Sequence, residues 1–146
     1  MSDNYVLSLV RDVSVDEVSE NQIVIQTWDR RFHLKNLTPG LRRAILVLSS
    51  DGATEDELAR TALQLDGDSS IARFYFYMQM FSEHRIMLHS VQSNGFRLAT
   101  LAPLSKYFQF LQKAINPAAE YELSQFAYLH KEKGELVLDL LSPTGR

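Results

Sequence analysis

The sequence predicts an α+β protein: a winged helix-turn-helix with an N-terminal antiparallel β-sheet, three helices and a β-hairpin wing, followed by an arm and a partial second β-hairpin. Short β-rich runs open the chain, helical spacing begins after residue 37, and strand alternation returns around an Asn-Gly turn. The 146 residues, without cysteine, allow one ordinary core and some extra. They exclude a large multidomain enzyme, a disulfide scaffold and a thiolate metal site.

Three runs near the N-terminus have the composition of strands. Residues 5–10 and 23–27 are short and β-rich, and residues 31–37 alternate apolar with polar side chains. The three residues 28–30 suit a hairpin connection between the second and third runs. We therefore expect the three runs to form one small antiparallel sheet.

Two helix starts follow. Thr38 is placed to cap a helix that has Pro39 at its first position, where a missing N–H costs nothing. Thr54 and Glu57 form a capping box, which predicts a second helix over residues 55–65. The residues of this helix that we expect to face the core are Leu58, Ala62 and Leu65.

A third helix, capped by Asp68 or Ser69, is predicted to run to about His84, and it is apolar on two faces. One face carries Ile71, Phe74, Tyr75, Met78 and Phe81. The other carries Arg73, Phe76, Tyr77, Met80 and His84. The second face needs a partner of its own. That partner is either the chain's own arm, through Tyr107, Phe108 and Leu111, or a peptide bound by strand addition beside residues 31–37.

Two hairpins are predicted after the helices. The first joins residues 86–91 to 96–101 through Asn94-Gly95 and forms the wing. The second joins residues 121–129 to 135–141. We expect two domains, which are the winged-helix module at 1–102 and the arm with an incomplete second module at 103–146.

An internal repeat would explain the tail. Tyr5-Val6-Leu7-Ser8 matches Tyr121-Glu122-Leu123-Ser124, and Ile23-Val24-Ile25 matches Leu136-Val137-Leu138, at offsets of 116 and 113 residues. Chance similarity between short β-rich strings is the alternative.

The sequence shows no catalytic motif. The four histidines form no compact ligand pattern, and no phosphate-binding glycine loop or nucleophile elbow is present. Fifteen Lys and Arg against eighteen Asp and Glu make nucleic acid an unexpected partner. With no membrane-length apolar stretch and no export signal, we expect a cytoplasmic protein that does not enter membranes.

Two segments resemble the N-terminal region of SagB/ThcOx-type dehydrogenases. They are FHLKNLTPGLRRAILVLSSDGATEDELARTAL, which precedes the aromatic third helix, and the tail YELSQFAYLHKEKGELVLDLLSP. The resemblance implies a system in which an FMN-dependent enzyme oxidises azolines in ribosomally made peptides, as in bacteriocin and cyanobactin biosynthesis. The family's FMN lies in a nitroreductase-like catalytic domain that this chain does not contain. The chain alone is therefore expected to bind no cofactor or metal and to be no enzyme.

The resemblance further implies a module like the recognition elements that bind leader peptides. Its expected partner is a precursor leader peptide or the nitroreductase-like FMN domain. By position, the peptide-binding residues would be Phe32, His33, Leu34, Lys35, Arg73, Phe76, Tyr77 and Met80. Two alternatives stay open: a winged-helix DNA-binding transcriptional regulator, and a truncated remnant without a partner.

Overall fold

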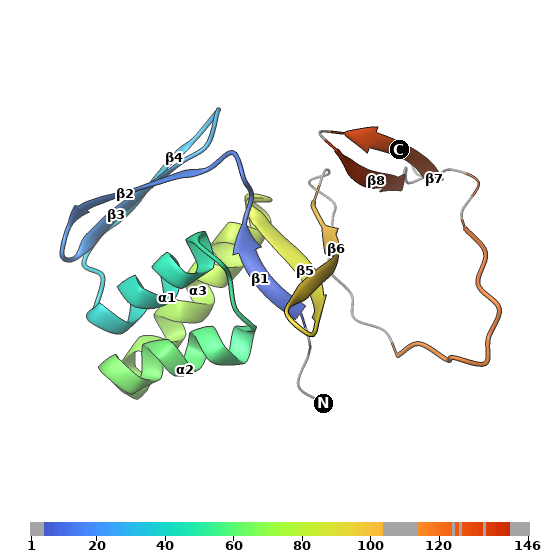
Figure 1. The fold of residues 1–146 in the computed structure, drawn as a ribbon. Coiled ribbons are helices and arrows are strands. Elements are labelled where there is room, and N and C mark those ends of the chain that lie inside the picture. Colours follow the sequence, from blue (N-terminus) through green and yellow to red (C-terminus); the bar gives the residue numbers. More distant parts are fainter. Residues whose placement is uncertain (1–4, 104–113, 124, 126, 133, 141–146) are drawn as a thin grey trace. The chain divides into compact units, whose positions relative to one another are not determined.

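The computed structural model describes residues 5–103, 114–123, 125, 127–132 and 134–140 (Figure 1). The chain divides into two compact units, residues 1–109 and 110–146. Among the described residues, the longest helix has 13 residues, and none is long and apolar enough to cross a membrane.

The first unit has the predicted α+β composition with three helices. Its elements in chain order are β1 (Tyr5–Leu9), β2 (Ser14–Ser19), β3 (Gln22–Gln26), β4 (Arg31–Leu34), α1 (Pro39–Ser49), α2 (Glu55–Asp66), the 3-10 turn η1 (Asp68–Ser70), α3 (Ile71–Glu83), β5 (Met87–Ser93) and β6 (Phe96–Leu101). The three predicted helices and the β3–β4 and β5–β6 hairpins are confirmed. These elements are compatible with a helix-turn-helix domain.

The predicted opening sheet is wrong in its membership. β1 does not join β3 and β4; it pairs with β5 from Tyr5↔Val91 to Leu9↔Met87, in a sheet of order β1-β5-β6. The third strand of the other sheet is β2, whose sequence SVDEVS was not predicted as a strand. β2 has no apolar alternation because its residues are exposed, except for half-buried Val15. The sheet that contains the candidate peptide-binding strand therefore has the order β2-β3-β4.

Trp28 lies in the turn between β3 and β4. It is the only tryptophan of the chain, and it is 92% exposed. The turn is held by the Thr27 hydroxyl, which donates to the Asp29 carboxylate over 2.9 Å, and by the Thr27 amide, which donates to the Arg30 carbonyl over 2.8 Å. The tryptophan ring therefore stands in solvent at the entrance to β4.

The core of the first unit is formed by the three helices together with strands of both sheets. Its largest fully buried apolar side chains are Ile23, Ile25, Leu41, Ile45, Leu48, Leu58, Phe74 and Phe81. Leu65 was expected to join them and is instead 58% exposed. The buried residues of α2 are Leu58, Ala59 and Ala62, and Leu65 follows them one residue before the end of the helix.

The N-terminus of α1 is capped by a residue from the end of α2. Thr38 does not cap the helix with its own side chain, contrary to the prediction; its hydroxyl donates to the Asp66 carboxylate over 2.5 Å. The same carboxylate accepts the amides of Gly40, at 2.9 Å, and Leu41, at 3.0 Å. Asp66 thus satisfies two helix-end donors that would otherwise lack a partner.

The start of α2 follows the prediction. The Thr54 hydroxyl accepts the Glu57 amide, and the Glu57 carboxylate accepts the Thr54 amide over 2.9 Å. Hydrogen bonds from the Thr54 backbone and side chain hold the pKa of the Glu57 carboxyl below its usual value. The capping box therefore favours the ionised glutamate.

α3 buries residues from both of its predicted faces. Phe74, Met78 and Phe81 are buried as expected, whereas Tyr75 is 47% exposed and Tyr77, from the second face, is buried. Ser70 occupies the N-cap position without a side-chain hydrogen bond, and η1 precedes it, so the expected cap by Asp68 or Ser69 is wrong. Tyr107, Phe108 and Leu111 lie outside the described residues.

His89 gives the first unit a pH dependence. This half-buried residue of β5 pairs with Leu7 and Leu101, and burial lowers the pKa of its imidazole below 6.5. The unfolded chain therefore takes up the proton at a higher pH than the folded chain, and stability falls as the pH drops through about 6.5. In urea denaturation at about pH 7 and pH 5, we expect His89→Gln to lose less stability on acidification than the parent chain. Equal losses in the two proteins would contradict this role.

The second unit contains one described hairpin. β7 (Ala127–Glu132) pairs with β8 (Glu135–Leu140) from Ala127↔Leu140 to Glu132↔Glu135. The hairpin is confirmed, but residues 121–123 do not belong to its first strand, contrary to the prediction. Adding the 113-residue offset to the residue numbers of β2 gives those of β7. The same offset converts the pair Ser19↔Gln22, which flanks the turn after β2, into the pair Glu132↔Glu135, which flanks the turn after β7. The hairpin thus matches β2–β3, and the described residues 121–123, which match the start of the string at residues 5–8, form no strand.

Candidate functional site

The candidate site combines an edge strand with a neighbouring helix. Among the strands that the structure describes, β4 is the outermost of its sheet, and residues of α3 and its C-terminal end contact it at two points. Near the start of α3, the Arg73 guanidinium donates to the carbonyls of Lys35, at 3.0 Å, and Asn36, at 2.7 Å. Just after α3, the ring of His84 lies 5.0 Å from the ring of Phe32. The helix therefore runs antiparallel to β4 and is tied to both ends of the strand.

The backbone of β4 has donors and acceptors that do not face β3. Hydrogen-bonded and non-hydrogen-bonded residue pairs alternate along an antiparallel ladder. The amide of Thr27 donates to the carbonyl of Arg30, so these two residues form a hydrogen-bonded pair, and every second pair after them is hydrogen-bonded too. The amides of Phe32 and Leu34 then face β3. The residues whose backbone groups face away are Arg31, His33 and Lys35. Because Arg73 already occupies the Lys35 carbonyl, the open stretch ends before Lys35.

Of the eight predicted binding residues, two are buried and six are half-buried or exposed. Leu34 and Tyr77 are core residues, 3% and 7% exposed, so their side chains offer little surface to a partner. Phe76 is 61% exposed. The remaining five are half-buried or exposed: Phe32, His33, Lys35, Arg73 and Met80. We call Phe32, His33, Lys35, Arg73, Phe76 and Met80 the β4–α3 surface.

Tyr77 contributes to this surface indirectly. The Arg73 guanidinium carbon lies 5.8 Å from the centroid of the Tyr77 ring, and the guanidinium also donates to the Tyr77 hydroxyl over 3.0 Å. These contacts fix Arg73 against Asn36, which has a positive φ of 55°. Tyr77 is therefore a positioning residue for Arg73.

The sequence did not single out the link between Arg30 and α3. Arg30 donates from Nη1 to Nδ1 of His84 over 2.7 Å, and its Nε lies 3.2 Å from the Asp29 carboxylate. His84 was predicted on the second face of α3, but nothing in the local pattern pairs it with Arg30. This contact closes the turn end of the site.

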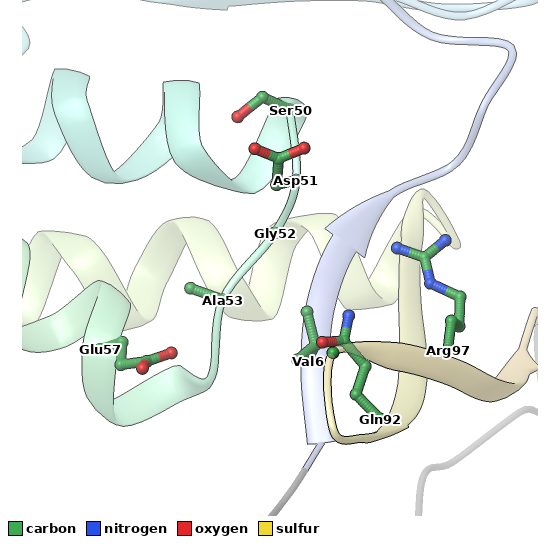
Figure 2. Close-up of a pocket in the computed structure, with 9 residues that line it drawn as sticks. Val6, Ser50, Asp51, Gly52, Ala53, Glu57, Gln92 and Arg97 are labelled. Atoms are coloured by element: carbon green, nitrogen blue, oxygen red, sulfur yellow. The ribbon is translucent and has the colours of Figure 1, made fainter.

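A separate hollow of about 480 Å³ lies at the far end of α1 (Figure 2). Its lining residues are Val6, Ser50, Asp51, Gly52, Ala53, Glu57, Gln92, Gly95 and Arg97. None of the eight predicted binding residues lines it. Its walls are mostly polar, and the Glu57 carboxylate is engaged in the capping box. The described residues also contain no group of three acidic or histidine side chains that could hold a metal ion.

Comparison with known families gives a match over most of the chain. The family described as the ThcOx helix turn helix domain matches residues 1–112. The chain belongs to this family. The matched part of the ThcOx helix turn helix domain contains all elements from β1 to β6, including the β4–α3 surface, and it ends before the β7–β8 hairpin. No curated protein matches the chain.

The family match associates this ThcOx helix turn helix domain with ThcOx-type dehydrogenases. It supports the N-terminal resemblance that the sequence suggested. A helix-turn-helix domain is a non-catalytic kind of module, which agrees with the lack of catalytic motifs in the sequence.

Proposed function

We propose that this chain is a peptide-recognition module of a ThcOx-type dehydrogenase system, and that it binds a precursor leader peptide by strand addition to β4. The observation that carries the proposal is the open edge of β4, which presents the backbone groups of Arg31 and His33 next to a helix with an exposed aromatic side chain. Main-chain hydrogen bonds of an added strand give affinity, and pockets for alternate side chains give specificity.

The apolar side chains of the β4–α3 surface support this mode of binding. Phe76 projects from α3, and Phe32 and Met80 are packed against the core but only partly buried. A strand laid along β4 places every second side chain toward α3. Those side chains would cover Phe76, which is 61% exposed.

FMN belongs, in this proposal, to a separate nitroreductase-like domain that performs the oxidation. The chain's own residues then recognise peptide and supply no redox group. We expect the purified chain to lack a flavin absorption spectrum and to bind FMN no better than millimolar. Micromolar FMN binding would contradict the non-catalytic part of the proposal.

Recognition of DNA by α3 is less well supported. A recognition helix needs free polar side chains directed at base edges and phosphates. Arg73 is engaged with the carbonyls of Lys35 and Asn36, and the Gln79 amide donates to the Glu83 carboxylate over 2.8 Å. The helix therefore has few groups left for base readout.

The test uses peptides selected from a random phage-displayed library against the full chain. Synthetic versions are titrated into the ¹⁵N-labelled protein, where shifts of the Arg31 and His33 amides report pairing at β4. We expect Phe76→Ala to weaken binding about tenfold, since truncating an aromatic anchor at an interface typically has an effect of this size.

Leu65→Ala is the matched control, because Leu65 is exposed to a similar extent, 58%, on α2. It should leave the affinity unchanged. Both variants remove exposed side chains and should fold as the parent does. Selected peptides that shift only amides outside β4 and α3, or equal affinities in both variants, would refute the assignment of the site.

A further inference from the structure

The residues around β4 carry an excess of positive charge that the chain as a whole does not have. The chain has a formal net charge of −3, yet residues 30–50 contain Arg and Lys but no Asp or Glu. Three cationic side chains border the open edge of the strand: Arg31, Lys35 and Arg73. Within the part of the chain that the structure describes, none of these three has a carboxylate at ion-pair distance.

Two carboxylates that neighbour the site in sequence, those of Asp29 and Glu83, already have partners. Asp29 pairs with Arg30 and accepts the Thr27 hydroxyl. Glu83 accepts the Gln79 side-chain amide. By contrast, the described partners of Arg31 and Arg73 are neutral oxygens, those of Gln26 for the first and of Lys35, Asn36 and Tyr77 for the second. Among the described residues, Arg31 and Arg73 therefore have hydrogen-bond partners but no ion-pair partner.

The two faces of an added strand would meet different chemistry. The side chains of Phe32 and Leu34 point to the core side of the sheet, whereas Arg31, His33 and Lys35 stand on the opposite side. Directly opposed residues of neighbouring strands share a face and interact. Alternate side chains of an added strand would thus face the apolar groups of Phe32, Phe76 and Met80. The side chains between them would face the cations Arg31 and Lys35.

We propose that the peptide bound at β4 is an acidic segment that alternates apolar residues, facing α3, with Asp or Glu, facing Arg31 and Lys35. This inference rests on the proposed strand addition and adds the chemistry of the partner. The paired stretch is short, because Arg73 closes the edge at the Lys35 carbonyl. It covers about four residues opposite β4, roughly 13 Å of strand.

The test compares three synthetic peptides of about twelve residues with the same apolar positions and with Glu, Gln or Lys at the alternate positions. Affinity for the full chain is measured by calorimetry at about 50 mM and about 500 mM NaCl. We expect the Glu peptide to bind about tenfold more tightly than the Gln peptide at low salt, and the ratio to fall to about twofold at high salt. The Lys peptide should bind most weakly.

Charge reversal locates the effect. Arg31→Glu and Lys35→Glu should each reduce the preference for the Glu peptide severalfold. The matched control is Arg97→Glu, which makes the same charge change at an exposed position on β6 and should preserve the preference.

Each other outcome has a definite meaning. If the Gln peptide binds as tightly as the Glu peptide and Phe76→Ala weakens both, the acidic preference is wrong and strand addition stands. If none of the three peptides shifts the amides of β4, both proposals fail for this class of ligand. Tighter binding to a DNA duplex of about 20 base pairs than to the Glu peptide at the same salt would assign the cations to nucleic acid and overturn the inference.

Discussion

Substituting Gly40 by alanine is expected to lower the free energy of unfolding by about 3 kcal/mol. Gly40 is the second residue of α1, and its amide donates to Asp66 at the end of α2. Figure 1 shows the start of α1 beside the end of α2. A Cβ atom built there would lie 2.5 Å from the carbonyl oxygen of Ala62 and 2.6 Å from an Asp66 carboxylate oxygen. The first of these is a backbone atom, so it moves only if the two helices separate.

Urea denaturation followed by circular dichroism measures the effect, because a shifted midpoint with an unchanged slope reports stability alone. Arg43→Ala, an exposed change on the same helix, is the control and should shift the free energy by less than about 0.5 kcal/mol. A Gly40→Ala protein as stable as this control would show that α1 and α2 can part at little cost.

The second large effect is expected from Asp66→Ala, which should lower the free energy of unfolding by about 2 kcal/mol. The change removes the acceptor of the Thr38 hydroxyl and of the Gly40 and Leu41 amides. The two amides sit at the positive end of α1, where a carboxylate is also favoured by the helix dipole. Asp66→Asn keeps the shape and one acceptor oxygen, so it should cost less than Asp66→Ala.

The double variant Gly40→Ala with Asp66→Ala separates the two effects. The alanine methyl at position 40 would displace the Asp66 carboxylate, so part of the cap is already lost in Gly40→Ala. The combined loss should be smaller than the sum of the two single losses, as for residues in direct contact. Full additivity would contradict the shared contact.

Local sequence patterns were sufficient to predict the helices. They were not sufficient to predict contacts between residues that lie far apart in the sequence. Thr54 and Glu57 satisfy each other within one turn, so the start of α2 could be predicted from four residues. The Asp66 cap of α1 joins positions 26 residues apart and has no local pattern. β1 carries the composition of a strand, but its partner, β5, lies beyond all three helices. β2 was missed because a mostly exposed strand does not alternate.

The candidate site, too, could be predicted only in part from local sequence patterns. Helical spacing placed Arg73, Phe76, Tyr77 and Met80 on one side of α3, but it could not tell that Tyr77 turns into the core while Phe76 stays in water. The bonds from Arg73 end on backbone carbonyls, which every residue has, so no side-chain pattern reveals them.

The exposed Trp28 gives the chain a built-in optical reporter. Its indole is already in water in the folded state, so unfolding should change its emission little. A ligand that extends along β4 past Arg30 would cover the ring and move the emission to shorter wavelength. Tryptophan fluorescence would then follow occupancy of the strand edge almost independently of folding, and no dye would be needed on either partner.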